Sequence, residues 1–182
     1  LRETLQRLER DGWVEIHHGK PTRVKDYLRE GRLGVLNSLA EHLDSVPQDF
    51  VAYLLAVRLA MAPMYTSLAV EKAPDEVIQR LKEGMDLQDS SEKFSHFDWG
   101  LQHQLTLLSG NPVFAMILNS FEDLYLKLAP IYYSIPEARQ RSLSYYRNLS
   151  KAVKDHDIEL TKRLTKEVMQ DSINFWQQTD LM

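Results

Sequence analysis

Residues 1–24, LRETLQRLERDGWVEIHHGKPTRV, combine the pattern of a short helix with the pattern of a hairpin. Leucines recur at positions 1, 5 and 8, which is helical spacing, and the arginines between them fall largely on the other faces. Gly12 follows this pattern and predicts the end of the helix, because glycine accepts the left-handed backbone that a helix C-terminus often requires. We therefore expect a helix over residues 1–11.

The second half of the stretch predicts two short strands joined by a tight turn. Residues 13–16 contain strand formers, residues 18–21 are typical of a turn, and residues 22–24 return as a second strand. A short arginine-bearing helix followed by such a hairpin matches the recognition helix and wing of a winged helix-turn-helix, whose helix lies in the DNA major groove. The pattern alone also allows an unrelated small helix with a hairpin.

The same residues resemble a known family of bacterial proteins. The LRE, LQRL and RDGW segments and the HGKPT turn are similar to the end of the DNA-binding domain of GntR-family transcription regulators, most closely of the FadR branch, which regulates fatty-acid metabolism. The resemblance implies that residues 1–25 are the C-terminal part of a winged helix-turn-helix domain whose N-terminal part is absent here. Residues 26–32 would then be a linker.

Four residues of this stretch match positions that contact operator DNA in the FadR branch: Arg2, His18, Gly19 and Lys20. By this resemblance Arg2 would serve phosphate or guanine, Gly19 would let the backbone come close, and Lys20 would reach into or across the minor groove. The alternative for Lys20 is a solvated turn lysine. The resemblance also implies a homodimer that reads a palindromic double-stranded operator with two winged helices.

Length and composition bound the class of protein. The chain has 182 residues, 43% of them hydrophobic and 26% charged, which is typical of a globular protein. No run approaches the ~18 apolar residues of a membrane span, so we expect no membrane partner and a cytoplasmic location. The absence of cysteine excludes disulfides and thiolate metal sites. Residues 1–25 hold six bases and four acids, and the rest of the chain is acidic.

Beyond residue 32 the periodicity predicts helices and no convincing strand. The fold class expected is mainly α: a partial winged helix-turn-helix followed by an antiparallel helical-bundle ligand domain of about seven helices over residues 33–182. This agrees with the all-helical ligand domain, often called FCD, that the FadR branch carries. The expected helices cover residues 33–43, 48–72, 74–84, 91–108, 112–133, 136–156 and 158–178.

The histidines do not predict a metal site. No HExxH or comparable close pair is present among them. Many relatives with this helical domain bind a divalent metal through one aspartate and three histidines. Counting from the break at residues 109–112, Asp98 takes the carboxylate position, but Gln102, Tyr146 and Ser172 take the histidine positions. We therefore expect no metal and no cofactor.

Several polar side chains on apolar helices are candidates for a binding site. Arg58 lies in a long apolar run, where it would either form a salt bridge, reach water, or receive an anionic group inside the bundle. Tyr125 and Tyr132 are seven residues apart, and Ser172 and Trp176 are four apart, so each pair shares a helix face. Each of these residues could equally be ordinary core.

The resemblance to the FadR branch implies a pocket for long-chain acyl-CoA, an effector ligand and not a cofactor. Arg58 would meet the anionic phosphates, the hydroxyl groups would bind the pantetheine and thioester, and apolar side chains would enclose the acyl tail, at up to ~0.8 kcal/mol per buried methylene. In this chain Gln102 replaces an aromatic residue, Met169 a glycine and Leu181 a lysine. The pocket residues are Arg58, Gln102, Tyr125, Tyr132, Ser172 and Trp176.

The leading hypothesis is an acyl-CoA-responsive transcription regulator, released from operator DNA by its ligand. The resemblance implies repression of fatty-acid degradation genes, and activation of unsaturated fatty-acid synthesis stays open. One alternative is a GntR-family regulator that senses a small organic acid. A second is an enzyme acting on acyl thioesters, which no nucleophile–base pair or glycine-rich phosphate loop supports, so we expect no enzyme. A third, a plain helical interaction module, does not explain the wing or the arginine helix.

Overall fold

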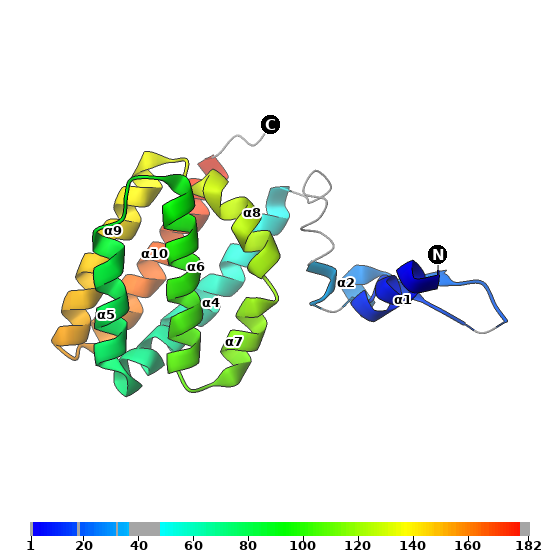
Figure 1. Ribbon diagram of the computed structural model, residues 1–182, viewed down its shortest axis with the longest axis horizontal. Coiled ribbons are helices and arrows are strands. Elements are labelled where there is room, and N and C mark those ends of the chain that lie inside the picture. Colours follow the sequence, from blue (N-terminus) through cyan, green and yellow to red (C-terminus); the bar gives the residue numbers. More distant parts are fainter. Residues whose placement is uncertain (1, 18, 32, 37–47, 179–182) are drawn as a thin grey trace. The chain divides into compact units, whose positions relative to one another are not determined.

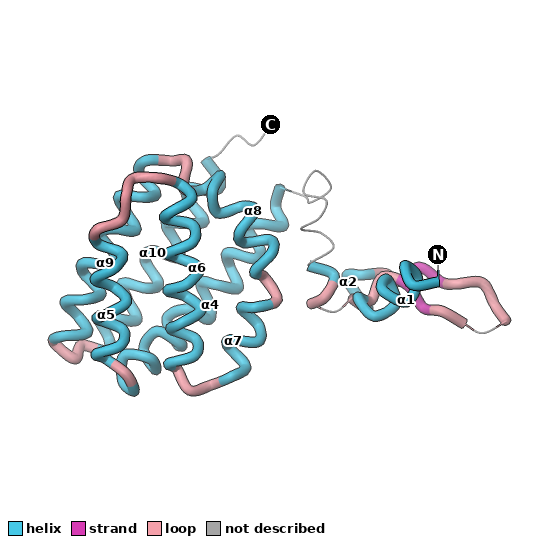
Figure 2. The backbone as a smooth tube through the Cα atoms, viewed as in Figure 1, coloured by secondary structure: helices cyan, strands magenta, loops and turns pink. Residues whose placement is uncertain are grey.

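The computed structural model describes residues 2–17, 19–31, 33–36 and 48–178 (Figures 1 and 2). Packing divides the chain into two compact units: an N-terminal unit, Leu1–Val46, and a helical unit, Pro47–Met182. Val35 and Leu36 are buried, and Gly34 lies beside the backbone of Asp11 within the N-terminal unit. The predicted boundaries between residues 25 and 33 stay predictions.

The N-terminal unit contains the predicted helix and hairpin. Gly12 ends the first helix with a φ of 95°, and its N–H donates to the carbonyls of Leu8 and Glu9. The two strands pair antiparallel, with Val14 opposite Val24, and Gly19 in the turn has a φ of 76°. The elements are α1 (Arg2–Asp11), β1 (Val14–Glu15), β2 (Arg23–Val24) and α2 (Tyr27–Glu30).

All the regular secondary structure in the described part of the helical unit is α-helix, which confirms the mainly α fold class. Figure 1 shows its long helices running up and down beside one another. The helices are α4 (Gln48–Lys72), α5 (Pro74–Met85), α6 (Ser91–Leu108), α7 (Pro112–Asn119), α8 (Glu122–Tyr132), α9 (Pro136–Lys154) and α10 (Ile158–Gln178).

Local signals set most of the helix starts. Side-chain oxygens of Ser90 and Asn111 accept from backbone N–H groups in the first turns of α6 and α7. Asp157 does the same for α10, accepting from the N–H of Leu160 at 2.8 Å, as predicted. Prolines occupy the first turns of α5, α7 and α9, where their missing N–H has no helical partner to lose.

Some predicted boundaries are wrong. The single helix expected over residues 112–133 is two helices, because the N–H groups of Ser120 and Phe121 bond to carbonyls three residues back and close a tight turn between α7 and α8. The helix expected to end at residue 156 ends at Lys154, and His156 has a left-handed φ of 52°. Most of the helix expected over residues 33–43 lies outside the described residues.

Helix α4 is the centre of the packing. It makes its most extensive contact with α10 and also contacts α5 and α6.

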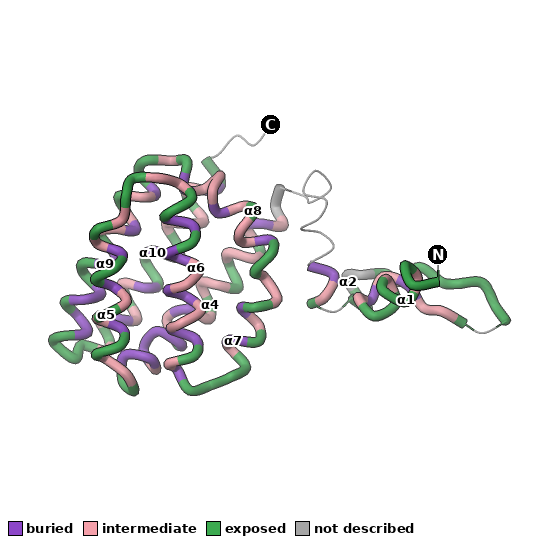
Figure 3. Tube along the Cα trace, in the orientation of Figure 1, coloured by how far each residue is buried: buried purple, intermediate pink, exposed green. Residues whose placement is uncertain are grey.

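The segment Phe50–Lys72 of α4 is long and apolar enough to cross a membrane by length and composition, so the expectation that no run approaches such a span is wrong. Core helices pass the same test. The most buried large side chains of the unit include Tyr65, Leu101, Tyr145 and Tyr146. Along its helices, buried positions alternate with exposed ones (Figure 3).

Candidate functional site

A cavity opens within the helical unit, with walls from α4, α6, α7, α8, α9 and α10. Its volume is about 860 Å³ with its open mouth included. Apolar side chains form most of the wall. The lining residues are Val51, Leu54, Leu55, Arg58, Asp98, Trp99, Leu118, Phe121, Leu124, Tyr125, Leu128, Ala129, Tyr132, Tyr133, Ser142, Tyr145, Val168, Met169, Ser172 and Trp176.

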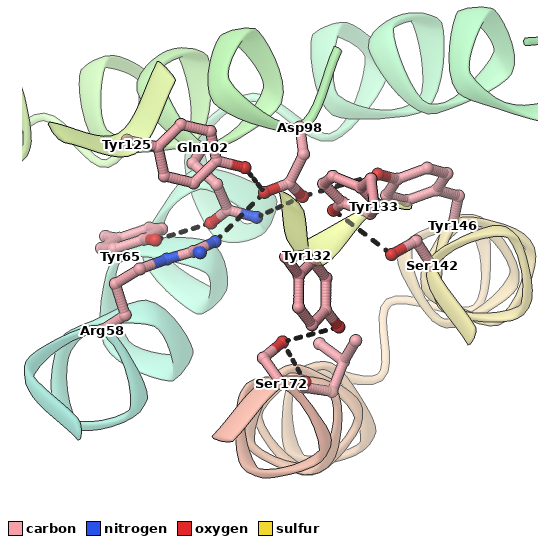
Figure 4. A network of polar contacts seen from close by, with 11 residues as sticks. Arg58, Tyr65, Asp98, Gln102, Tyr125, Tyr132, Tyr133, Ser142, Tyr146 and Ser172 are labelled. Atoms are coloured by element: carbon pink, nitrogen blue, oxygen red, sulfur yellow. Dashed lines mark hydrogen bonds and ion pairs between the residues drawn. The ribbon is translucent and has the colours of Figure 1, made fainter. Parts of the chain in front are cut away.

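Asp98 of α6 is the centre of the polar contacts in this cavity (Figure 4). One carboxylate oxygen accepts from Arg58 Nη2 at 3.2 Å and from the Tyr125 hydroxyl at 2.6 Å. The other accepts from Gln102 Nε2 at 3.4 Å and the Tyr146 hydroxyl at 3.5 Å. Side chains from four helices therefore converge on one carboxylate.

Arg58 is the counter-ion of this carboxylate. Its side chain is 16% exposed and that of Asp98 is 8% exposed, so the pair is largely withdrawn from water. The guanidinium also lies over the Tyr125 ring, 5.2 Å from its centroid. Burial, the largest single influence, lowers the pKa of Arg58, but the charge of Asp98 and the surrounding tyrosine hydroxyls together outweigh it, and the net pKa is raised. Arg58 therefore forms the salt bridge that was one alternative for it.

Two of the three positions expected to replace metal-binding histidines meet at Asp98, and the third, Ser172, bonds to Tyr132 instead. Gln102 and Tyr146 both donate to Asp98, and Gln102 is fixed in turn by the Tyr65 hydroxyl, which donates to its Oε1 at 2.6 Å. Among the described residues, no three His, Asp or Glu side chains come close enough to hold a metal ion. With one carboxylate and a guanidinium beside it, these residues do not fit a divalent metal.

A second polar group lies on the α8–α10 side of the cavity. The Tyr132 hydroxyl donates to Ser172 Oγ at 3.3 Å, and Ser172 donates to the carbonyl of Val168 at 2.9 Å. Burial raises the pKa of Tyr132, and the bond to Ser172 opposes that shift in part. The hydroxyl is therefore neutral at physiological pH and able to donate.

The structure brings most of the predicted ligand-binding residues together. Arg58, Tyr125, Tyr132, Ser172 and Trp176 all line the cavity. Gln102 does not line it: its side chain is buried behind Asp98. Met169, which replaces a glycine of related proteins, is 3% exposed and lines the wall. Leu181 lies outside the described residues.

The predicted DNA-contacting residues belong to the N-terminal unit. Arg2 is exposed at the start of α1, and Gly19 and Lys20 are exposed in the turn of the hairpin. His18 lies outside the described residues. Arg23 of β2 binds Glu15 at 2.9 Å and Glu30 at 2.7 Å, so carboxylates already neutralise its charge.

Comparison with known proteins identifies the family. The model of the family described as FadR C-terminal domain matches residues 25–181. A fatty acid metabolism regulator protein of Shewanella halifaxensis is 36% identical over 178 residues, covering 97% of this chain and 74% of the relative. The chain belongs to the FadR family. A regulator of the same name from Yersinia enterocolitica is 41% identical over 152 residues, covering 82% of this chain and 63% of the relative.

Solved structures share the fold of this chain at low sequence identity. Streptococcus agalactiae GntR superposes with a TM-score of 0.60 and 18% identity, covering 95% of this chain and 79% of that one. E. coli McbR/YncC superposes with a TM-score of 0.61 and 19% identity, covering 98% of this chain and 84% of that one. The family model and the curated relatives confirm the FadR-family resemblance found in residues 1–24, and those relatives are named as regulators of fatty acid metabolism.

Sequence reasoning missed part of the polar centre of this FadR-family domain. Asp98 was considered only as a metal ligand, although its spacing of four from Gln102 placed both on one helix face. Tyr65, Tyr133 and Trp99 were not singled out. The Tyr133 hydroxyl and Ser142 Oγ are hydrogen-bonded at 3.4 Å. Trp99 packs on Tyr125 with 5.2 Å between ring centroids. No local pattern marks these contacts.

Proposed function

We propose that this chain is a transcription regulator that responds to long-chain acyl-CoA and is released from operator DNA by that ligand. The observation that carries the proposal is the largely apolar cavity of the helical unit, lined by five of the residues that the FadR resemblance implies. The names of the relatives, regulators of fatty acid metabolism, support the same class of ligand.

The wall of the cavity suits an acyl chain. Leucines from α4, α7 and α8 line it together with Met169 and Trp176 of α10, so methylenes of the ligand would leave water for an apolar surface. The volume of about 860 Å³ includes open solvent at the mouth, so the enclosed part of the cavity is smaller. Enclosing a long chain would therefore require the walls to separate, and binding would favour a different arrangement of the helices.

The polar side chains would hold the head of the acyl group. Tyr132 and Ser172 supply neutral hydroxyls for a thioester or pantetheine oxygen, whereas the Tyr125 hydroxyl donates to Asp98. For Arg58 to receive a phosphate, as the resemblance implies, that phosphate would have to compete with a carboxylate oxygen 3.2 Å away. Neutral contacts to the thioester are therefore better supported than a phosphate contact inside the cavity.

The N-terminal unit would carry the DNA-binding surface. Arg2, His18, Gly19 and Lys20 are proposed to contact a double-stranded palindromic operator, with two copies of the chain acting as a cytoplasmic homodimer. Repression of fatty-acid degradation genes would follow from occupancy of such an operator, and activation of unsaturated fatty-acid synthesis from a second class of site. Release requires the ligand to bind the DNA-free arrangement more tightly, because equal affinity for both shifts nothing.

The test is an electrophoretic mobility shift with the full-length protein and operator DNA, with and without oleoyl-CoA. We expect the shifted band to weaken with oleoyl-CoA and to be unaffected by CoA alone. Unchanged DNA affinity at saturating oleoyl-CoA would remove the proposed mechanism. Release by a short organic acid instead would favour the regulator of small acids. Thioester hydrolysis during the incubation would revive the enzyme hypothesis.

A further inference from the structure

The cavity contains one positive and one negative side chain, and they are paired. Among the lining residues that the structure describes, Arg58 and Asp98 are charged and all the others are neutral. Their nearest atoms are 3.2 Å apart. The wall that meets a ligand therefore has no net charge, although it contains an arginine.

Asp98 is held in place by donors on every side. Its carboxylate accepts from Arg58, the Tyr125 and Tyr146 hydroxyls and the Gln102 amide. Arg58 makes its one hydrogen bond within the described residues to this carboxylate, and its Nε has no partner there. The guanidinium is thus neutralised by Asp98 and still has donors that an anion could use if Asp98 were absent.

A ligand carboxylate entering this cavity would meet two costs. It would lose its hydration in an apolar wall, and it would lie near a second carboxylate that already holds the guanidinium. A neutral thioester, amide or ester has neither cost, and the Tyr132 hydroxyl, only loosely bound to Ser172 at 3.3 Å, can donate to its carbonyl oxygen.

We propose that Asp98 is a specificity-determining residue that neutralises Arg58 and thereby restricts the cavity to acyl groups whose buried head is uncharged, excluding free fatty acids. The phosphates of an acyl-CoA would stay at the open mouth, in water. The proposal rests on the proposed function, since it concerns the ligand of the same cavity, and it assigns the discrimination between thioester and free acid to one carboxylate.

The test compares oleate with oleamide, which has the same chain and a neutral head, by calorimetric titration of the purified chain below the micelle concentration. We expect the wild-type chain to bind oleamide at least about tenfold more tightly than oleate. Asp98→Asn should raise the affinity for oleate at least about tenfold, because Arg58 is then free to pair with the ligand. Asp89→Asn, which removes a carboxylate that is 70% exposed and paired with Arg139 outside the cavity, should behave as wild type.

The double variant Arg58→Gln/Asp98→Asn separates charge from shape. This variant should not show the higher affinity for oleate expected of Asp98→Asn, because no cation remains in the wall. It should still bind oleamide. Equal binding of oleate and oleamide to the wild-type chain, or of neither, would overturn the proposal, and this comparison needs no variant to fold. No gain for oleate in a folded Asp98→Asn chain would overturn it as well.

Failure of the proposed function would look different. Oleoyl-CoA would leave the DNA affinity of the full-length protein unchanged, while the preference of the cavity for oleamide over oleate persisted. Conversely, release of DNA by oleoyl-CoA together with tight binding of oleate would keep the proposed function and remove the role of Asp98.

Discussion

Arg58 and Asp98 form the most deeply buried ion pair in the part of the chain that the structure describes, with side chains 16% and 8% exposed. Placing both charges in the bundle costs several kcal/mol of desolvation, and the surrounding hydroxyl and amide donors offset part of it. Such a pair adds little net stability compared with apolar residues. Loss of one partner is expensive, because the other charge stays buried without compensation.

We therefore expect Arg58→Met to lower the free energy of unfolding by roughly 3 kcal/mol, because Asp98 then stays buried without its counter-ion. Urea denaturation followed by circular dichroism would measure it. The matched control is Arg163→Met, which removes an exposed arginine 4.0 Å from Glu167 on α10 and should change the midpoint little. The double variant Arg58→Met/Asp98→Leu should recover most of the loss. If Arg58→Met and Arg163→Met lowered the free energy of unfolding equally, the Arg58–Asp98 pair would not be buried in solution.

The partner of Arg58 could not be predicted, because 40 residues separate the two side chains and only tertiary packing brings them together. The apolar run around Arg58 did predict that an unpaired charge would be costly there. What could be predicted was therefore the need for a partner, and not its identity. The same holds for Tyr132 and Ser172, which are also 40 residues apart. The family resemblance implied that both residues line one pocket, but not that they bond to each other.

At the scale of the elements, helix starts were predictable and one break was not. Prolines and capping side chains at the starts of α7 and α10 act within a few residues, so the sequence contains the whole cause. The break between α7 and α8 falls at Ser120 and Phe121, which include neither glycine nor proline. Phe121 lines the cavity, a tertiary position that no local pattern marks.

Close contact between α5, α6 and α9 depends on Gly84. A Cβ at this position would overlap the Phe97 ring and lie 3.0 Å from the Tyr146 ring, so Gly84→Ala should push the helices apart and cost roughly 1–3 kcal/mol of unfolding free energy. The control is Gly100→Ala on α6, where the Cβ would meet only the end of the Arg80 side chain. That flexible end can move, and alanine favours the helix by up to about 1 kcal/mol.

Thermal and urea unfolding of the two variants would test this difference. We expect a lower midpoint for Gly84→Ala and an unchanged or higher one for Gly100→Ala. Similar midpoints for both variants would mean that the three helices are not in close contact at this point.

At the scale of the whole molecule, the helical unit buries an unusual set of phenols. Burial raises the pKa of six tyrosine hydroxyls above the usual value of 10.0. Each raised pKa stabilises the fold fully below pH 10, where the unfolded chain also keeps its phenols protonated. This contribution is lost as the pH rises above 10 through the higher pKa values of the folded state.

Stability should therefore fall steeply above pH 10, and the buried phenols should ionise only as the chain unfolds. Tyrosinate absorbance and circular dichroism, followed together in an alkaline titration, should give coincident transitions. Tyr146→Phe should make the fall in stability with pH less steep, whereas Tyr53→Phe, at a side chain that is 66% exposed, should not. Tyrosinate formation by all the tyrosines well before unfolding would contradict the burial of this set.

The same packing limits the cavity, and Met169 is one of the residues that belong to both the core and the cavity wall. It is 3% exposed, belongs to the core cluster and also lines the cavity. Met169→Ala should lower the free energy of unfolding by roughly 2–4 kcal/mol through the space it leaves. The same space should admit an acyl chain with less separation of the helices, so affinity for oleoyl-CoA should rise. Met116→Ala, at a methionine that is 67% exposed, is the control.

Because a ligand that binds only the folded chain stabilises it in proportion to the logarithm of its concentration over Kd, the two effects can be separated. Without ligand, Met169→Ala should melt below the wild-type chain and Met116→Ala should melt with it. As oleoyl-CoA is added, the melting temperature of Met169→Ala should rise more than that of the wild type, so the gap between the two melting temperatures should narrow. A gap that stays constant at every concentration would show that Met169 supports the fold without limiting the ligand.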